Sequence, residues 1–205
     1  MEDQKPPRQL LLVEDDDGFR LALRTMFERL RFIVTEAANG RIAQEIFDKN
    51  SNYFDIIVSD VRMPEMDGVN LLKHIRSIDK AVKFVLMTGF TEVFEAKQAF
   101  DMGANEFLAK PFRTESIRTV VENCFPGREK EYFERNDPEN YEQIAVDRLM
   151  NLSKFSTDLY IRLSERKFIK IAHSGDAIDH ERLEAYREKK VDIFYIRKSQ
   201  SKKVG

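Results

Sequence analysis

Between residues 8 and 124, five short apolar runs alternate with five segments of helical periodicity. The apolar runs, which we expect to be strands, are Leu10–Val13, Phe32–Val34, Phe54–Val58, Val82–Met87 and Glu106–Leu108. The expected helices are Phe19–Arg29, Arg41–Asp48, Val69–Arg76, Glu92–Phe100 and Glu115–Cys124. Alternation of this kind predicts βαβ units around a parallel sheet. The runs lack polar residues at alternate positions, so we expect an α/β domain whose doubly wound sheet carries helices on both faces.

Composition limits the remaining possibilities. The 205 residues are enough for one large or two small domains. A formal net charge of −2, with 34% charged residues, argues against a broad nucleic-acid or membrane surface. The single cysteine, Cys124, excludes an internal disulfide framework and fits a reducing compartment. Because the first apolar run is far too short for a signal peptide or a membrane span, we expect a soluble cytoplasmic protein.

A second region follows the α/β pattern. Pro126-Gly127 ends the last helix, and the charged residues up to Asp137 are typical of a linker. We therefore expect domains at residues 8–124 and 138–205, joined by a linker at 125–137. Asp137-Pro138 is a good helix start. The apolar residues after it recur at helical spacing, which predicts a helix through Tyr141, Ile144, Ala145, Leu149 and Leu152.

The rest of this region predicts strands around one helix. Asp158–Leu163 and Lys167–Ile171 alternate in polarity as strands do, and Val191–Ile196 is a final apolar strand. Gly175 marks a turn. Asp179 is expected to cap a helix that runs through Lys189, with Leu183 and Tyr186 on one face. The sequence thus predicts a small α+β domain after the linker.

Polar side chains follow four of the expected strands of the first domain. Glu14 and Asp15 follow the first strand, Asp60 the third, Thr88 the fourth and Lys110 the fifth. Open α/β sheets place their sites at the carboxyl ends of their strands. In a flavodoxin-like sheet of strand order 2-1-3-4-5, the first and third strands are neighbours. Glu14, Asp15 and Asp60 are then expected to share one acidic pocket.

The chemistry expected of this pocket is phosphoryl transfer. Three crowded carboxylates are costly unless a cation joins them, and hard oxygen ligands suit Mg²⁺. A carboxylate can act as a nucleophile and form an aspartyl-phosphate. Lys110 would supply a mobile positive charge, and Thr88 can donate its hydroxyl proton to a phosphoryl oxygen. Each of these residues, taken singly, has an ordinary explanation. An acidic run such as Glu14–Asp17 usually caps a helix and forms its first turn, and we expect Asp16 or Asp17 to cap the first helix. The joint pattern favours the functional interpretation.

Residues 8–124 resemble receiver domains of bacterial response regulators. Four segments carry the resemblance: Leu11–Asp16 (LLVEDD), Ser59–Gly68 (SDVRMPEMDG), Met87–Phe90 (MTGF) and Gly103–Phe112 (GANEFLAKPF). The resemblance implies phosphotransfer from a histidine kinase or a phosphotransfer protein to Asp60. It implies Mg²⁺ held by Asp15, Asp60 and the backbone carbonyl of Arg62, with Glu14 acting through water. It also implies a cis peptide bond between Lys110 and Pro111, and no enzymatic activity beyond self-phosphotransfer and autodephosphorylation.

The same resemblance implies a switch. Thr88 would move toward the phosphate, and Phe107 would then turn inward; the alternative is that Phe107 is a permanent core residue. The affected face is formed by the fourth helix, the fifth strand and the fifth helix, and carries Phe90, Phe94, Lys97, Phe107, Phe112 and Arg113. An apolar patch there would serve as a homodimer or partner surface, or pack against the C-terminal region.

The output of the second domain stays open. Nearly balanced charges and the absence of a helix-turn-helix pattern argue against DNA binding. Arg162-x-x-x-Arg166 matches half of the PilZ motif for cyclic-di-GMP, but the other half is missing. Several segments are similar to a small accessory domain found beside receivers and HD-GYP phosphodiesterases: Thr157–Leu163, Lys167–Ile171, Gly175-Asp176, Glu181–Tyr186 and Val191–Ile196. That similarity implies an interaction or dimerisation module with an unknown protein target. A cyclic-di-GMP sensor and a phosphorylation-independent dimeric scaffold are the alternatives.

Overall fold

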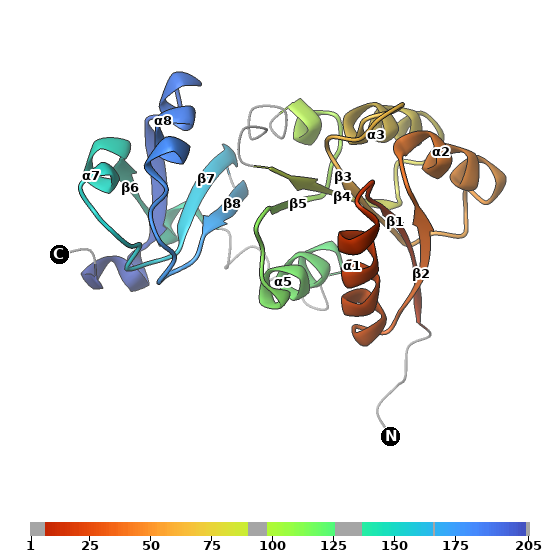
Figure 1. Ribbon diagram of the computed structural model, residues 1–205, viewed down its shortest axis with the longest axis horizontal. Coiled ribbons are helices and arrows are strands. Elements are labelled where there is room, and N and C mark those ends of the chain that lie inside the picture. Colours follow the sequence, from red (N-terminus) through yellow and green to blue (C-terminus); the bar gives the residue numbers. More distant parts are fainter. Residues whose placement is uncertain (1–6, 90–97, 126–136, 166, 204–205) are drawn as a thin grey trace. The chain divides into compact units, whose positions relative to one another are not determined.

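The computed structural model describes residues 7–89, 98–125, 137–165 and 167–203 (Figure 1). The chain divides into two compact units, one built mainly from residues up to Cys124 and the other mainly from residues after it. Each unit contains its own β-sheet. Within the described residues, no helix is both long enough and apolar enough to cross a bilayer.

The first unit is built around a five-stranded sheet of order β2-β1-β3-β4-β5, which confirms the predicted fold class. Its strands are β1 (Arg8–Val13), β2 (Phe32–Ala37), β3 (Ile56–Asp60), β4 (Lys83–Thr88) and β5 (Glu106–Ala109). β1 pairs with β2 and β3, and β3 with β4, all in parallel. Its helices are α1 (Asp17–Arg29), α2 (Gly40–Lys49), α3 (Gly68–Ile78) and α5 (Thr114–Cys124). Figure 1 shows α1 and α5 on one side of the sheet and α2 and α3 on the other.

The expected helix at Glu92–Phe100 falls mostly outside the described residues. Residues 98–101 are helical. Phe90, Phe94 and Lys97, which we expected on the switch face, also lie outside the described part of the chain.

The central strands β1 and β3 form the core of this unit. All five residues of β3 are buried, and so are Leu10 to Val13 of β1, because helices cover both faces of the sheet. Full burial of each large aliphatic side chain is worth about 1.5–3 kcal/mol. Side chains also fix the helix starts, since Asp16 accepts a hydrogen bond from Phe19 N (2.7 Å). This confirms the expectation that Asp16 or Asp17 caps the first helix.

The second unit is a small α+β structure, as predicted. Its strands are β6 (Tyr141–Ala145), β7 (Leu159–Ser164), β8 (Lys167–Ala172) and β9 (Ile193–Arg197), in the order β6-β9-β7-β8. The paired strands β6–β9, β7–β8 and β7–β9 are antiparallel. Its helices are α7 (Val146–Met150) and α8 (His180–Glu188), with the 3-10 turns η2 (Pro138–Asn140) and η3 (Lys198–Lys203). Asp179 caps α8 as expected, and Gly175 has a left-handed φ of 91°.

The helix predicted from Asp137 through Leu152 is confirmed only at Val146–Met150, which forms α7, and is wrong before it. Asp137 does cap a turn, but only a 3-10 turn, and Tyr141–Ala145 forms β6 instead. Tyr141 and Ile144 are three residues apart, which fits one face of a helix but places them on opposite faces of a strand. Both are buried, because both faces of this sheet are covered at those positions. Pairing of β6 with β9 therefore overrides the local helical spacing.

Candidate functional site

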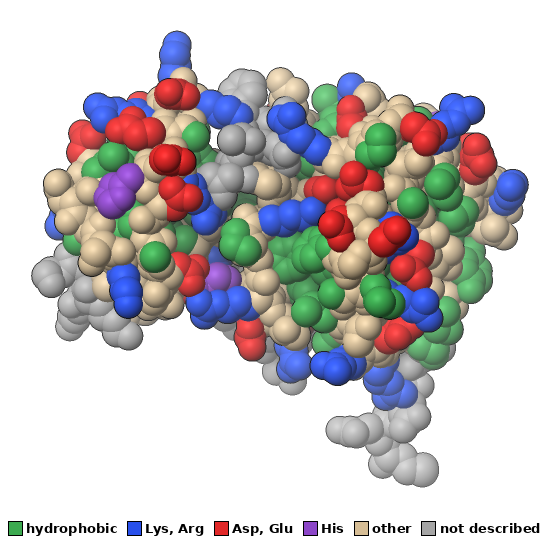
Figure 2. All heavy atoms as spheres, viewed as in Figure 1, with side chains coloured by type: hydrophobic (Ala, Val, Ile, Leu, Met, Phe, Trp, Pro, Cys, Tyr) green, Lys and Arg blue, Asp and Glu red, His purple; other side chains and the backbone are tan. Residues whose placement is uncertain are grey.

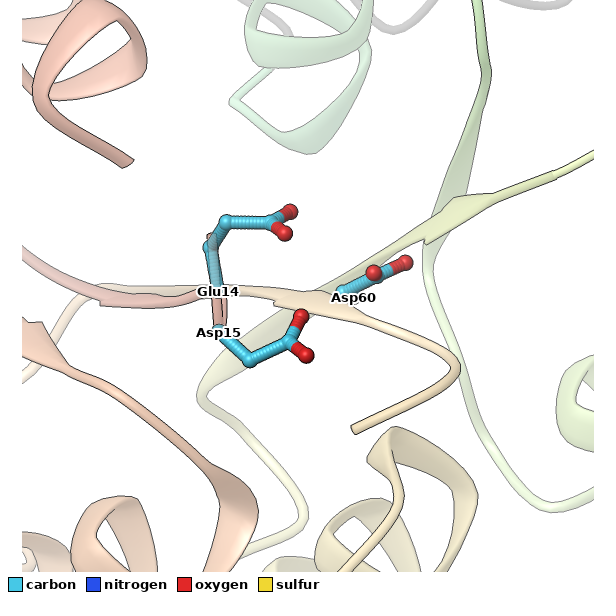
Figure 3. A group of neighbouring side chains, drawn as sticks. All are labelled: Glu14, Asp15 and Asp60. Atoms are coloured by element: carbon cyan, nitrogen blue, oxygen red, sulfur yellow. The ribbon is translucent and has the colours of Figure 1, made fainter. Parts of the chain in front are cut away.

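Three carboxylates meet at the ends of β1 and β3. Glu14 and Asp15 follow β1, Asp60 ends β3, and the two strands are neighbours with Val13 opposite Ser59. One oxygen from each carboxylate lies within 4.8 Å of the others. Figure 3 shows Glu14 and Asp15 pointing to the same side of the sheet end as Asp60, and Figure 2 shows acidic side chains gathered on this part of the surface. The structure thus brings together the three acids that the sequence singled out.

Asp60 is held by backbone hydrogen bonds on a rigid strand. Its Oδ1 accepts a hydrogen bond from Val61 N (2.8 Å), and the same N–H also donates to Met87 O of β4 (3.0 Å). Ser59 Oγ donates to the carbonyl oxygen of Asp60 (2.9 Å). Asp60 is only 8% exposed, so its carboxylate can be reached by a small group and is shielded from most of the solvent. This combination gives a well-placed nucleophile.

The start of α3 lies directly against the backbone of Asp60. Gly68 N donates to Val61 O (2.9 Å), and a Cβ added at Gly68 would lie 2.1 Å from the carbonyl oxygen of Asp60. Only a glycine allows this approach. Gly68 ends the segment Ser59–Gly68 that resembles receiver domains, and its place at the first position of a helix was the available signal for this close packing.

The loop between β3 and α3 is tied to the start of α2. Asn39 Nδ2 donates to Glu65 Oε1 (3.0 Å), and Gly40 N donates to Met66 O (3.2 Å). Asn39 is buried and also caps α2 by accepting from Ile42 N (2.9 Å). These contacts fix the loop that carries Arg62, whose side chain is exposed. Sequence reasoning missed Asn39, because its partner Glu65 is 26 residues away.

Arg20 anchors the other side of the pocket. Its Nη1 donates to the backbone carbonyl of Glu14 (2.7 Å), and the guanidinium also pairs with Asp17 and with Glu36 (3.5 Å). Glu14 Oε1 in turn accepts from Asp16 N (3.4 Å). These contacts with Arg20 and Asp16 fix the β1–α1 loop and hold Glu14 and its neighbour Asp15 at the pocket. A cation one turn into the first helix was the only signal in the sequence.

The remaining predicted site residues come from β4 and β5. Thr88 ends β4, one residue after Met87, which lies opposite Asp60, and it is fully buried. Lys110 follows β5, and its peptide bond to Pro111 is cis, as the resemblance implied. β5 neighbours β4, so both residues lie at the same end of the sheet as the acids.

Phe107 lies in β5 and is 3% exposed. A buried ring at this position agrees with both of its expected functions, a switch residue turned inward and a permanent core residue. Phe112 contacts Phe19 of α1 instead, with ring centroids 5.8 Å apart.

The donor set suits a hard divalent cation. Asp15 is exposed while Glu14 and Asp60 are buried, so a cation held between them would keep part of its water shell. Mg²⁺ prefers oxygen ligands with several retained waters. Charge neutralisation also offsets the mutual repulsion of three carboxylates within 4.8 Å. The residues present therefore fit a magnesium site.

Comparisons with known proteins agree with this geometry. A family model described as the response regulator receiver domain matches residues 10–122. Sporulation initiation phosphotransferase F of Bacillus subtilis (strain 168) is 31% identical over 118 residues, which cover 58% of this chain and 94% of that protein. Regulatory protein AtoC of Escherichia coli (strain K12) is 36% identical over 116 residues, 57% of this chain but only 25% of AtoC, so the chain spans a quarter of that relative.

Among solved structures, a putative response regulator from Chloroflexus aurantiacus J-10-fl superposes with a TM-score of 0.52 at 32% identity. The superposition covers 58% of this chain and 97% of that one.

Proposed function

This chain belongs to the response regulator receiver family of two-component signalling, and we propose that Asp60 is its phosphoryl acceptor. The observation that carries the proposal is the group of three carboxylate oxygens within 4.8 Å at the ends of β1 and β3. Only Asp60 of the three ends a strand and is held by a backbone N–H on the next residue. That fixed position makes it the nucleophile.

In the proposed reaction, a carboxylate oxygen of Asp60 attacks the phosphorus of a phosphohistidine donor. The P–N bond breaks, and the leaving imidazole nitrogen keeps the electron pair. Asp15, Asp60 and the backbone carbonyl of Arg62 would hold Mg²⁺, with Glu14 acting through water. The ion would supply charge neutralisation and orientation, which account for most of the catalysis in phosphoryl transfer.

Lys110 and Thr88 act on the transferred group. Lys110 would pair with the new phosphoryl charge, and the Thr88 hydroxyl would donate to one of its oxygens. Their places after β5 and at the end of β4 support these functions. Movement of Thr88 toward the phosphate would alter the packing of Phe107 and increase the population of the signalling state. The size of this shift is limited by how much more favourably the phosphate interacts with the signalling state than with the resting state.

Receiver domains interact with histidine kinases or phosphotransfer proteins, and the proposed donor is one of these. We assign no enzymatic activity beyond self-phosphotransfer and autodephosphorylation, and we place the protein in the cytoplasm, where such donors act. The proposed output is a protein-interaction or dimerisation function of residues 138–205. One route is homodimerisation through the face formed by the fourth expected helix (Glu92–Phe100), β5 and α5. The cyclic-di-GMP alternative draws no support from Arg162, whose guanidinium donates to Ser164 O and Glu165 O in its own hairpin.

The test is phosphorylation of the full chain with acetyl phosphate or a phosphohistidine donor in the presence of Mg²⁺. Intact mass should show one added phosphoryl group on the wild type and none on Asp60→Asn. Asp101→Asn, which changes an exposed acid elsewhere, should behave as wild type. Chelation of Mg²⁺ should stop the reaction. Equal labelling of wild type and Asp60→Asn would contradict the assignment.

A further inference from the structure

One face of the second sheet carries a layer of aromatic rings. Phe194 packs against Tyr186 of α8 with ring centroids 5.3 Å apart, so the side chains that alternate with Phe194 along β9 lie on the other face. On that other face, Tyr141 of β6 stacks on Phe168 of β8 with centroids 3.8 Å apart and an interplanar angle of 8°. The two stacked rings therefore come from the two edge strands of the sheet.

Arg197 of β9 lies over this layer. Its Cζ is 5.6 Å from the ring centroid of Tyr141 and 5.8 Å from that of Tyr160. Lys170 also lies over Tyr160, but it has a counter-charge, since its Nζ is 2.7 Å from Asp158 Oδ2. Among the described residues no carboxylate forms an ion pair with Arg197. This face therefore carries a positive charge that the described part of the unit does not neutralise.

The hydrogen bonds of Arg197 show the same imbalance. Its Nη2 donates to the Tyr141 hydroxyl (3.5 Å), while its Nε is buried with no acceptor in the structure described. Stacking on aromatic rings satisfies the flat faces of a guanidinium but not its N–H groups, which lie in its plane. Tyr141 accepts the bond from Arg197, so its own O–H proton remains to be donated. The Tyr160 hydroxyl is a second partner of Arg197, so two hydroxyl groups face the five N–H groups of one guanidinium. Donors still outnumber acceptors at this half-buried side chain, which calls for an additional acceptor.

We propose that Arg197 and Tyr141 form a binding site for a phosphate group on the second unit. A phosphate presents several charged oxygens that match the guanidinium fork and a neighbouring hydroxyl. Lys198, the next residue in the chain and the first of η3, adds a second positive charge beside Arg197 in the sequence. The phosphate would come either from free inorganic phosphate or from a phosphate ester such as a nucleotide. This proposal is independent of the phosphorylation of Asp60.

Calorimetric titration of the full chain tests the site. Inorganic phosphate and cyclic-di-GMP are the two probes, each at constant ionic strength and with a chelator present, so that no divalent ion can recruit phosphate to the acidic pocket. We expect saturable binding of at least one probe. Arg197→Met, which keeps an apolar stem over the rings, should weaken that binding at least tenfold, and Tyr141→Phe several-fold. Arg187→Met, an exposed arginine that pairs with Asp147 (3.9 Å) and Glu184 (3.8 Å), should bind as wild type.

Thermal unfolding separates binding from a purely structural function. Removing a buried donor without an acceptor should leave Arg197→Met at least as stable as wild type in phosphate-free buffer. The bound probe should raise the unfolding temperature of wild type but not that of the variant. If Arg197→Met does not fold, Tyr141→Phe takes its place. Binding of inorganic phosphate identifies a free-anion site, and binding of cyclic-di-GMP alone identifies an ester site. No saturable binding of either probe, or unchanged binding by a folded variant, would overturn the proposal.

Discussion

Replacement of Gly68 by alanine tests how tightly the phosphoacceptor is built into the sheet. The added Cβ would lie 2.1 Å from the carbonyl oxygen of Asp60 and 3.0 Å from its carbonyl carbon, both backbone atoms that cannot rotate away. Since such contacts essentially never fall below 3.0 Å, α3 or the end of β3 must move by about 1 Å, close to the size of displacement that can cost a catalytic site a hundredfold in rate.

The expected stability change combines three effects. Forcing an extra carbon into a packed site costs about 1–3 kcal/mol. Separation of α3 from β3 also weakens the bond from Gly68 N to Val61 O (2.9 Å), worth about 1 kcal/mol. Alanine recovers up to about 1 kcal/mol of helix propensity. We therefore expect Gly68→Ala to lose about 1–3 kcal/mol and to accept phosphate roughly tenfold to a hundredfold more slowly.

Gly18 provides the matched control, because it also lies in the first turn of a helix. A Cβ there meets only the Asp16 Oδ1 atom at 3.4 Å, an ordinary contact. Gly18→Ala should be neutral or slightly stabilising and should phosphorylate at the wild-type rate. Urea unfolding by circular dichroism gives the stabilities, and the time course of intact mass with acetyl phosphate gives the rates. Wild-type stability and rate in Gly68→Ala would refute the reasoning.

Three further changes have defined outcomes. Asn39→Ala removes the cap on α2 and the bond to Glu65, and should cost about 1–2 kcal/mol in urea unfolding. Asp15→Asn should weaken Mg²⁺ binding at least tenfold in calorimetry while leaving the unfolding curve unchanged. Burial raises the pKa of Asp158, but the hydrogen bonds from Lys170 and Ser174 N outweigh it and hold that pKa below its ordinary value of 3.8. Its contribution to stability is therefore present above that pH and lost as pH falls through the lower folded pKa; Asp158→Asn should flatten this acid-side decline in thermal scans, and an unchanged decline would contradict it.

The receiver sheet could be predicted because each signal was local. Buried parallel strands are continuous apolar runs, and the site residues come at the ends of those runs, as Asp60 comes two residues after Val58. The second unit shows where local signals fail. The spacing of Tyr141 and Ile144 fits a helix, and only the partner strand β9, some fifty residues later, makes that segment a strand.

The same distinction explains which site residues the sequence missed. Arg20 and Asn39 bind no phosphate in the proposed mechanism; they hold the loops that do, and their partners are set by the fold. Arg20 reaches the Glu14 carbonyl across its own loop, and Asn39 reaches Glu65 between two helices. No spacing rule identifies such pairs, because polar residues near helix starts are common and usually only cap them.

The acidic pocket and the Arg197 site are recognised from different kinds of signal. At the acidic pocket, like charges are crowded by the topology of the sheet, and a motif marks the place because each acid must end or follow a particular strand. At Arg197, an excess of donors arises only where rings from β6 and β7 lie under one guanidinium. A charge that its own surroundings do not balance is costly to keep in a fold, so the charge of Arg197 points to an additional partner. For Asp60 the family guides the proposal; for Arg197 the donor geometry alone specifies an anion, which makes the calorimetric titration the decisive measurement for the second unit.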